Sequence, residues 1–263
     1  MKQYCYIIAC FLVFAGCRKT EETGKSGKIK FIFTHTIQGQ TLLPDSMIYH
    51  TASHYDYKVT DLQYFISDII LYHNGGQPIL LRSDNGIHYV DVRLPSTQSW
   101  TLGDEIPPGT FDSLSFTFGI NAAKNTSNHF PNPPERDMAW PVILGGGYHY
   151  LKMNLMYKNP PDDTIRPFMF HLGIGQIYST PVPDPDSITG YIQNYFSVTL
   201  NTRFAIGCGA LRTIQITMLV DRWFDGPETF DFSDYPNGIM QYQAGMHKAC
   251  TNGKQAFTGS VVK

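Results

Sequence analysis

The chain has 263 residues, of which 42% are hydrophobic, 14% aromatic and only 16% charged. This composition is typical of a globular protein with a sizeable core and excludes an intrinsically disordered chain. The formal net charge is −2, and the basic residues form no block beyond a short cluster of three lysines near the N-terminus. We therefore expect no nucleic-acid partner.

The first residues have the pattern of an export signal. Lys2 gives a positive start, an apolar run covers residues 6–15, and small residues stand just before Cys17. The ending Ala-Gly-Cys resembles a bacterial lipobox, which implies that residues 1–16 are removed and that Cys17 is lipidated. A transmembrane anchor is the alternative, but the apolar run of roughly 10 residues is shorter than the about 20 that a spanning helix needs.

The segment after Cys17 is polar and contains glycine, and we interpret residues 17–27 as a flexible tether. Residues 28–263 contain no linker or internal repeat, so we expect a single domain there. Glu21 and Glu22 resemble the surface-export signals of some gram-negative lipoproteins. The sequence thus predicts an outer-membrane lipoprotein of a gram-negative bacterium, held on the membrane by its lipid and facing either the periplasm or the cell surface.

Export determines which cysteines remain in the mature chain. Cys5 and Cys10 leave with the signal and Cys17 is acylated, so Cys208 and Cys250 remain in an oxidising compartment. A disulfide between them would close a loop of roughly 40 residues and contribute about 3 to 4 kcal/mol. Two buried free thiols are an equal alternative. The Cys and His spacing of a zinc site is absent.

The mature domain begins with an alternating pattern. Ile29, Phe31, Phe33 and His35 share one face of a half-buried strand, and the histidine stands at the end of that apolar face. Residues 58–73 could also form a helix, but their β-branched content and the Asn-Gly-Gly turn that follows favour a bent strand. Further strands are predicted over residues 79–82, 87–92, 113–120, 148–157, 168–174, 195–200 and 211–220.

These nine or so strands are separated by Pro, Gly and Asn and show no βαβ rhythm. The pattern indicates a sandwich or barrel, and we predict an all-β fold, an antiparallel β-sandwich of roughly nine strands. Residues 238–263 contain few β-branched residues before Val261, so one or two short helices are expected there.

The chain lacks the signatures of common enzymes. It has no Gly-x-Ser-x-Gly elbow, no HExxH, no GxGxxG opening a βαβ unit and no EF-hand loop. The paired carboxylates at 162–163 and 184–186 lie in Pro-rich turns, where such groups usually serve solvation and turn geometry. We therefore expect a protein without catalytic activity.

A different chemistry is suggested by nine histidines and nine methionines in an exported protein, because imidazole and thioether donors suit copper. His171 is the clearest candidate from the residues alone, since it lies in an apolar strand beside Gly173, where another group can approach closely. Regular strand alternation would place His149 on the face of Leu151 and His171 on the face of Met169, so the two histidines need not act together.

Several motifs together resemble the MbnP-like copper-binding proteins, which are exported β-sandwich proteins associated with copper handling. The resemblance covers most of the mature chain. It runs through KFIFTHTIQGQTL, YKVTDLQYFISDIIL, HYVDV, the stretch from Gly109 to Ile120, DMAW with GYHYLKMN, FMFHLG, and a tail with Met246-His247. Better-known members bind copper through histidines and a tryptophan that a diheme partner oxidises to kynurenine.

The resemblance implies which residues bind copper. His171 of FMFHLG is the best-matched ligand, and His35 of the first strand fits as a second. Trp140 of DMAW is the tryptophan in the most family-like context. The other residues that the resemblance offers are Trp100 and Trp223 as alternative modified tryptophans, and His149 and His247 as reserve ligands.

The sequence thus predicts an envelope-anchored copper-binding lipoprotein for copper uptake, storage or delivery. Its expected partners are the membrane, through the lipid, and a diheme tryptophan-oxidising protein or an outer-membrane transporter. The alternative is an envelope lipoprotein that binds a glycan or a protein partner through exposed aromatics. That alternative would gain if His35 and His171 lay far apart and an exposed aromatic platform formed from Tyr49, Tyr55, Tyr57 and Trp100.

Overall fold

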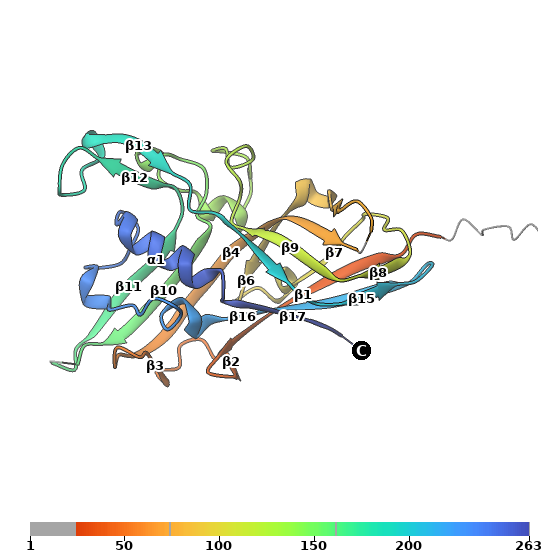
Figure 1. Cartoon of the computed structure of the whole chain (residues 1–263). Helices are drawn as coiled ribbons and strands as arrows, with labels where there is room; N and C mark the ends of the chain where they lie inside the picture. The colour runs from red at the N-terminus through yellow and green to blue at the C-terminus, as the bar shows by residue number, and fades with distance from the viewer. Residues whose placement is uncertain (1–24, 74, 161, 263) are drawn as a thin grey trace, which may run out of the picture.

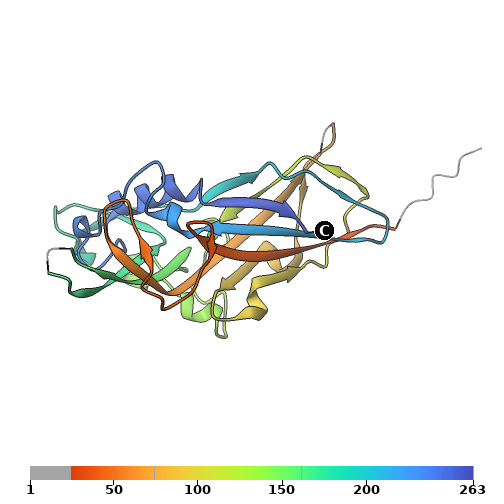
Figure 2. The ribbon, with the colours of Figure 1, turned by 90° about the horizontal axis from the view of Figure 1, so that it is seen from below.

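The computed structural model of the protein describes residues 25–73, 75–160 and 162–262. The predicted signal peptide and the lipidation site Cys17 lie outside the described residues. No helix in the described ranges is long and apolar enough to cross a membrane. The molecule is elongated, with the start of β1 at one end and the β12–β13 hairpin at the other (Figures 1 and 2).

One layer is a five-stranded sheet in the order β17-β16-β1-β2, with β7 also paired to β1. Its strands are β1 (Lys28–Ile37), β2 (Gln40–Thr41), β7 (Ser99–Thr101), β16 (Leu211–Leu219) and β17 (Phe257–Val261). β1 and β16 run parallel, and the other pairs in this sheet are antiparallel. The alternation predicted for the first strand is confirmed, because the side chains from Ile29 to Ile37 are buried at every second position.

The other layer is an eight-stranded sheet in the order β11-β10-β4-β9-β14, with β3, β5 and β6 also paired to β4. Its strands are β3 (Tyr49–His50), β4 (Asp56–Tyr72), β5 (Ile79–Leu80), β6 (Ile87–Asp91), β9 (Ser113–Phe118), β10 (Leu151–Lys158), β11 (Ile165–Leu172) and β14 (Phe196–Leu200). β4 is the long bent strand that the sequence predicts, and its pairing with β9 shifts register between Ser67 and Ile70. The bend lets one strand pair with β10 along one part and with β9 along another.

Shorter elements complete the fold. Two small ladders join β12 (Gly175–Tyr178) to β13 (Ile188–Ile192) and β8 (Gly109–Phe111) to β15 (Phe204–Ile206). The single α-helix of the described residues is α1 (Gln243–Gly253). The 3-10 turns are η1 (Ser83–Gly86), η2 (Pro95–Gln98), η3 (Glu135–Met138), η4 (Val142–Leu144), η5 (Pro185–Ser187), η6 (Val220–Trp223) and η7 (Phe232–Asp234).

Aromatic side chains fill the space between the two sheets. Phe118 of β9 stacks on Tyr64 of β4 at 5.7 Å and contacts Trp223 at 5.1 Å and Phe257 of β17 at 5.4 Å, all measured between ring centroids. Because β17 belongs to the five-stranded sheet, these contacts join the two layers. Large fully buried aromatics contribute most of the burial energy of such a core. The predicted all-β sandwich with a short C-terminal helix is confirmed.

The C-terminal segment needs one correction. Residues 243–253 form the expected helix, but Phe257–Val261 forms strand β17 rather than a second helix. The composition of this segment does not indicate a strand. It becomes one by pairing with β16, where Thr258 is opposite Thr217 and Ser260 is opposite Gln215. Tertiary pairing has here overridden a weak local preference.

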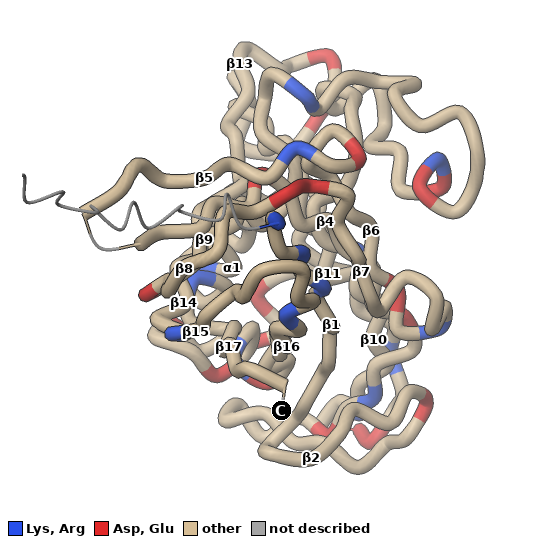
Figure 3. The backbone as a smooth tube through the Cα atoms, turned by 90° about the vertical axis from the view of Figure 1, so that its right-hand side faces the viewer, with Lys and Arg blue, Asp and Glu red and all other residues tan. Residues whose placement is uncertain are grey.

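The two remaining cysteines are free. Cys208 is exposed in the turn between β15 and β16, whereas Cys250 lies on α1, where its thiol contacts the backbone carbonyl oxygen of Asn194 at 3.2 Å. The possible Cys208–Cys250 disulfide therefore does not form in this structure. The Lys and Arg positions are mixed with the Asp and Glu positions in the view of Figure 3, and no stripe of one sign forms there.

Candidate metal centre

Three of the five predicted metal-binding residues lie together. The rings of His149 and His171 have their centroids 5.1 Å apart at an interplanar angle of 83°, and the Trp140 ring lies 4.7 Å from the His149 ring at 71°. All three side chains are buried. His171 stands near the end of β11, His149 just before β10, and Trp140 in the loop between η3 and η4.

Backbone hydrogen bonds bring Trp140 and His149 together. The His149 backbone N–H donates to the Met138 carbonyl oxygen at 2.8 Å, and the Trp140 N–H donates to the Gly147 carbonyl oxygen at 2.9 Å. The turn between these two segments contains three successive glycines with positive φ, at positions 145–147. That conformation is costly for residues with a Cβ, so the glycine run is what lets the chain reverse here.

The contact between His149 and His171 contradicts the expectation that they lie on different faces. Regular alternation begins only at Leu151, where β10 starts. Residues 148–150 precede the ladder, and the Tyr150 N–H donates instead to the carbonyl oxygen of Leu172. Counting by twos back from Leu151 therefore assigns His149 to the wrong side.

Hydrogen bonds define the tautomer of each imidazole. Nε2 of His171 lies 2.9 Å from Oδ1 of Asn154, and Nδ1 of His149 lies 2.9 Å from the carbonyl oxygen of Met138. Both of these oxygens can only accept, so the nitrogen beside each carries the proton. The lone pairs are left on Nδ1 of His171 and on Nε2 of His149. Nδ1 of His171 is buried and has no hydrogen-bond partner among the described residues.

Both imidazoles are neutral at pH 7. Burial lowers the pKa of His149 to about 4. Burial, then His149 and Lys152, lower the pKa of His171 to about 3. A neutral imidazole is the form that binds a metal ion, because protonation would occupy the lone pair. The pair is thus in its metal-binding form without having to release a proton.

The spacing suits one shared ion. A ring centroid lies roughly 3 Å from an ion held by one ring nitrogen at about 2 Å, so two centroids up to about 6 Å apart can share that ion. The observed 5.1 Å falls within this limit. The described residues contain no group of three or more His, Cys, Asp or Glu side chains arranged for a metal ion. The centre is therefore a pair of imidazoles without a carboxylate, beside a tryptophan.

Gly173 fixes the position of Trp140. A Cβ added at Gly173 would lie 2.6 Å from Cε3 and 2.7 Å from Cζ3 of the indole. The ring therefore packs directly on the backbone of the residue two positions after His171. The expectation that a glycine beside His171 permits close approach is confirmed, and the approaching group is Trp140.

His35 does not join this centre. Its Nε2 lies 3.0 Å from the hydroxyl oxygen of Tyr64, on the core side of the eight-stranded sheet. Tyr64 is paired with Leu151, whereas His171 is paired with Lys152, the next position along β10. Successive residues of a strand point to opposite faces, so the sheet separates His35 from His171. Burial lowers the pKa of His35 to about 4.

The other predicted residues lie elsewhere. His247 is exposed on α1. Trp223 is fully buried in the aromatic core. Trp100 of β7 stacks at 4.8 Å and 6° on His88 of β6 and donates from Nε1 to Oδ2 of Asp84 at 2.8 Å. These three residues therefore do not extend the centre around His149 and His171.

Sequence reasoning missed two polar residues beside the centre and one half-buried histidine. Asn154 and Asp61 form a hydrogen-bonded pair behind His171, and alternation along β10 could have placed Asn154 on the face of Lys152. His88 is half-buried between the rings of Phe33, at 5.2 Å, and Trp100, at 4.8 Å, and alternation in HYVDV could have shown that it faces the core.

The four aromatic residues proposed for an exposed binding platform do not form one. Each of its four proposed members is at least nine-tenths buried: Tyr49, Tyr55, Tyr57 and Trp100. Tyr55 and Tyr57 pack on aromatic rings from the segment after β16, which covers this end of the sheet. The glycan- or protein-binding alternative therefore loses the surface on which it depended.

Comparison with known proteins addresses the family directly. The family model described as MbnP matches residues 26–241. Among solved structures, MbnP from Methylosinus trichosporium is similar with a TM-score of 0.58 and 16% sequence identity, over 91% of this chain and 100% of that one. At that identity the likeness concerns the fold alone. No curated protein matches the chain. Because the family model spans most of its length, this chain belongs to the MbnP family.

Proposed function

We propose that this protein binds copper at the pair formed by His149 and His171, with Trp140 as the side wall of the site. The observation that carries the proposal is the buried Nδ1 of His171, which holds a lone pair and has no partner among the described residues. Leaving a buried polar atom unpaired costs about 1 to 3 kcal/mol, and a bound metal ion would remove that cost.

The donor set favours copper over other ions. Imidazole suits copper well, and first-row divalent affinities peak at copper. Magnesium and calcium require oxygen ligands, which the pair does not offer. The nearby Lys152 adds positive charge, so an ion of low charge, Cu(I), is favoured over a divalent one. Membership of the MbnP family supports a copper-associated role.

We further propose that the protein takes up, stores or delivers copper in the cell envelope and has no turnover of its own. The predicted lipid on Cys17 would hold it on the outer membrane, on either face. Copper would then pass to or from a partner, for which a diheme tryptophan-oxidising protein and an outer-membrane transporter are the candidates. Trp140 is the tryptophan that such an oxidising partner would modify, since its ring contacts His149.

The test uses the mature chain and a colorimetric Cu(I) chelator in competition. We expect one tightly bound Cu(I), with most of the affinity lost in His149→Ala and in His171→Ala. His35→Ala and His247→Ala are matched controls, because each removes an imidazole that lies outside the pair. Unchanged affinity in both pair variants, or equal losses in all four variants, would overturn the assignment.

A further inference from the structure

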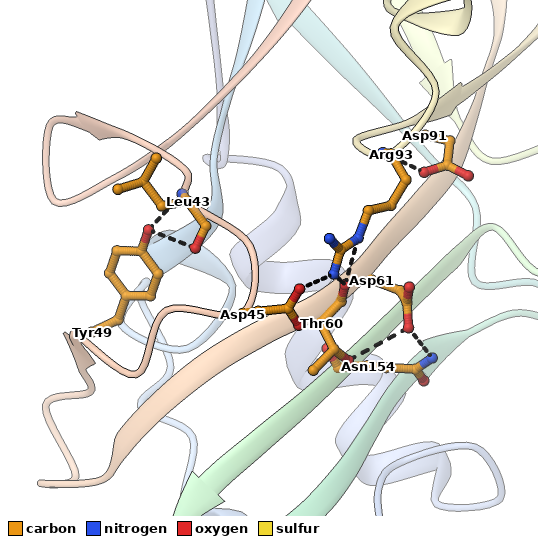
Figure 4. Close-up of polar contacts among 8 residues, drawn as sticks. All are labelled: Leu43, Asp45, Tyr49, Thr60, Asp61, Asp91, Arg93 and Asn154. Atoms are coloured by element: carbon orange, nitrogen blue, oxygen red, sulfur yellow. Dashed lines mark hydrogen bonds and ion pairs between the residues drawn. The ribbon is translucent and has the colours of Figure 1, made fainter.

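Behind His171, a short chain of polar side chains crosses two strands on the outer face of the eight-stranded sheet. Nδ2 of Asn154 donates to Oδ2 of Asp61 at 3.0 Å, and Oδ1 of the same amide lies 2.9 Å from Nε2 of His171. Figure 4 shows Asn154 on β10 directed at Asp61 of β4. Asn154 and Asp61 are register partners, and the Thr60 hydroxyl donates to the backbone carbonyl oxygen of Asn154 at 3.1 Å.

Asp61 determines which way the amide faces. An amide group can rotate by half a turn and present either its oxygen or its NH₂ group to a neighbour. A carboxylate accepts but does not donate, so Asp61 requires the NH₂ group. The oxygen must then face His171, and an oxygen there requires a proton on Nε2. The carboxylate thus places the imidazole lone pair on Nδ1 through one intervening amide.

We propose that Asn154, oriented by Asp61, is a positioning residue that selects the Nε2–H tautomer of His171 and so presents Nδ1 as the metal-binding atom. The tautomer is a property of the metal-free protein, whereas its effect on copper rests on the proposed function. Hydrogen-bond partners of this kind commonly fix the tautomer and the ring orientation of metal-binding histidines, and their loss typically lowers metal affinity about 10- to 100-fold.

The proposal specifies how variants should differ. Asn154→Leu removes the acceptor, so His171 should populate both tautomers. Asn154→Asp keeps an oxygen acceptor beside Nε2 and should retain the tautomer. Asp61→Leu leaves the amide free to rotate and should give a mixture of tautomers. In an Asn154→Asp background, which has no amide to rotate, the same change should leave the tautomer of His171 unchanged. Such a double-mutant comparison isolates the action of Asp61 through Asn154.

Nitrogen-15 NMR of the metal-free protein at neutral pH reads the tautomer directly, because protonated and unprotonated imidazole nitrogens have different shifts. We expect the Nε2–H form in the wild type and in Asn154→Asp, and a mixture in Asn154→Leu. Gln63→Leu is the matched control, since its amide lies on the same sheet face but donates to Asp91 at 3.0 Å. A wild-type tautomer that persists in a folded Asn154→Leu protein would overturn the proposal.

Cu(I) competition then measures the consequence. We expect Asn154→Leu to lose about 10- to 100-fold in affinity, while Gln63→Leu keeps the wild-type value. Asn154→Asp should bind Cu(I) more tightly than Asn154→Leu, because its carboxylate still accepts from Nε2–H of His171 and adds negative charge near the ion. Equal affinity in Asn154→Leu and wild type would contradict the positioning role. If no protein in the set binds Cu(I), the proposed function fails, whereas the NMR result still decides whether Asn154 and Asp61 set the tautomer.

Discussion

Replacing Gly173 with alanine tests whether the centre depends on close packing of Trp140. The added Cβ would lie 2.6 Å from Cε3 of the indole, a separation that real Cβ atoms essentially never show. Ordinary contact needs about 3.5 Å or more, so the ring must move by about 1 Å. The backbone at Gly173 is not left-handed, so the steric contact with Trp140 is the main expected effect.

The expected cost follows from overpacking a closed site. Such changes typically cost about 1 to 3 kcal/mol in the free energy of unfolding. Because the Trp140 ring contacts His149 at 4.7 Å, the displaced ring should also disturb the imidazole pair and weaken copper binding. Urea unfolding at neutral pH, followed by far-UV circular dichroism, gives the first quantity, and chelator competition gives the second.

Gly190→Ala is the matched control. It lies in strand β13, and its added Cβ would meet the Ile177 side chain at 3.4 Å, close to ordinary van der Waals contact. We expect this variant to keep wild-type stability within about 0.5 kcal/mol and wild-type copper affinity. If Gly173→Ala were as stable as Gly190→Ala and bound copper equally well, the described packing of Trp140 on Gly173 would be refuted.

Further predictions concern pH and the thiols. Burial lowers the pKa of His88 to about 4, below its unfolded value of about 6.5, so the contribution of this group to stability is complete above pH 6.5 and falls as the pH drops toward 4. Between pH 6.5 and 5 that loss is about 1.6 kcal/mol. Urea unfolding of His88→Gln should therefore show a flatter pH dependence of stability than the wild type, and identical slopes would contradict this prediction. Burial raises the pKa of the Cys250 thiol to about 12, so a thiol reagent should label exposed Cys208 quickly and Cys250 slowly, as mass spectrometry of timed samples would show. Finding the two joined in a disulfide in the native protein would contradict the structure.

The long strands could be predicted because their own side chains carry the signal. β1 alternates buried and outward positions along its whole length, and the sequence after β4 contains Asn-Gly-Gly, a combination that favours a turn. Of the strands with two to five residues, β5, β6 and β14 were predicted, whereas β12, β13 and β15 were not, because so few residues give periodicity little room to show. β17 was missed because its pairing with β16 stabilises it more than its own composition does.

The centre was only partly predictable for a similar reason. Its members were named from motifs, yet the contact between His149 and His171 depends on how the glycine turn at 145–147 delivers His149 to the edge of the sheet. Alternation holds inside a strand and fails one or two residues before it begins. The predicted pairing of His35 with His171 was wrong. Alternation along the first strand shows only that His35 faces the core, and it does not show that His171 lies on the outer face of the other sheet.

The most direct test of copper binding by His149 and His171 is X-ray absorption at the copper edge, on the mature protein loaded with one equivalent of Cu(I). We expect nitrogen ligands at about 2 Å, with the outer-shell scattering that is characteristic of two imidazoles. That pattern should persist in His35→Ala and disappear in the His149→Ala/His171→Ala double variant. An unchanged imidazole pattern in the double variant, or its loss in His35→Ala alone, would contradict the assignment of copper to this pair.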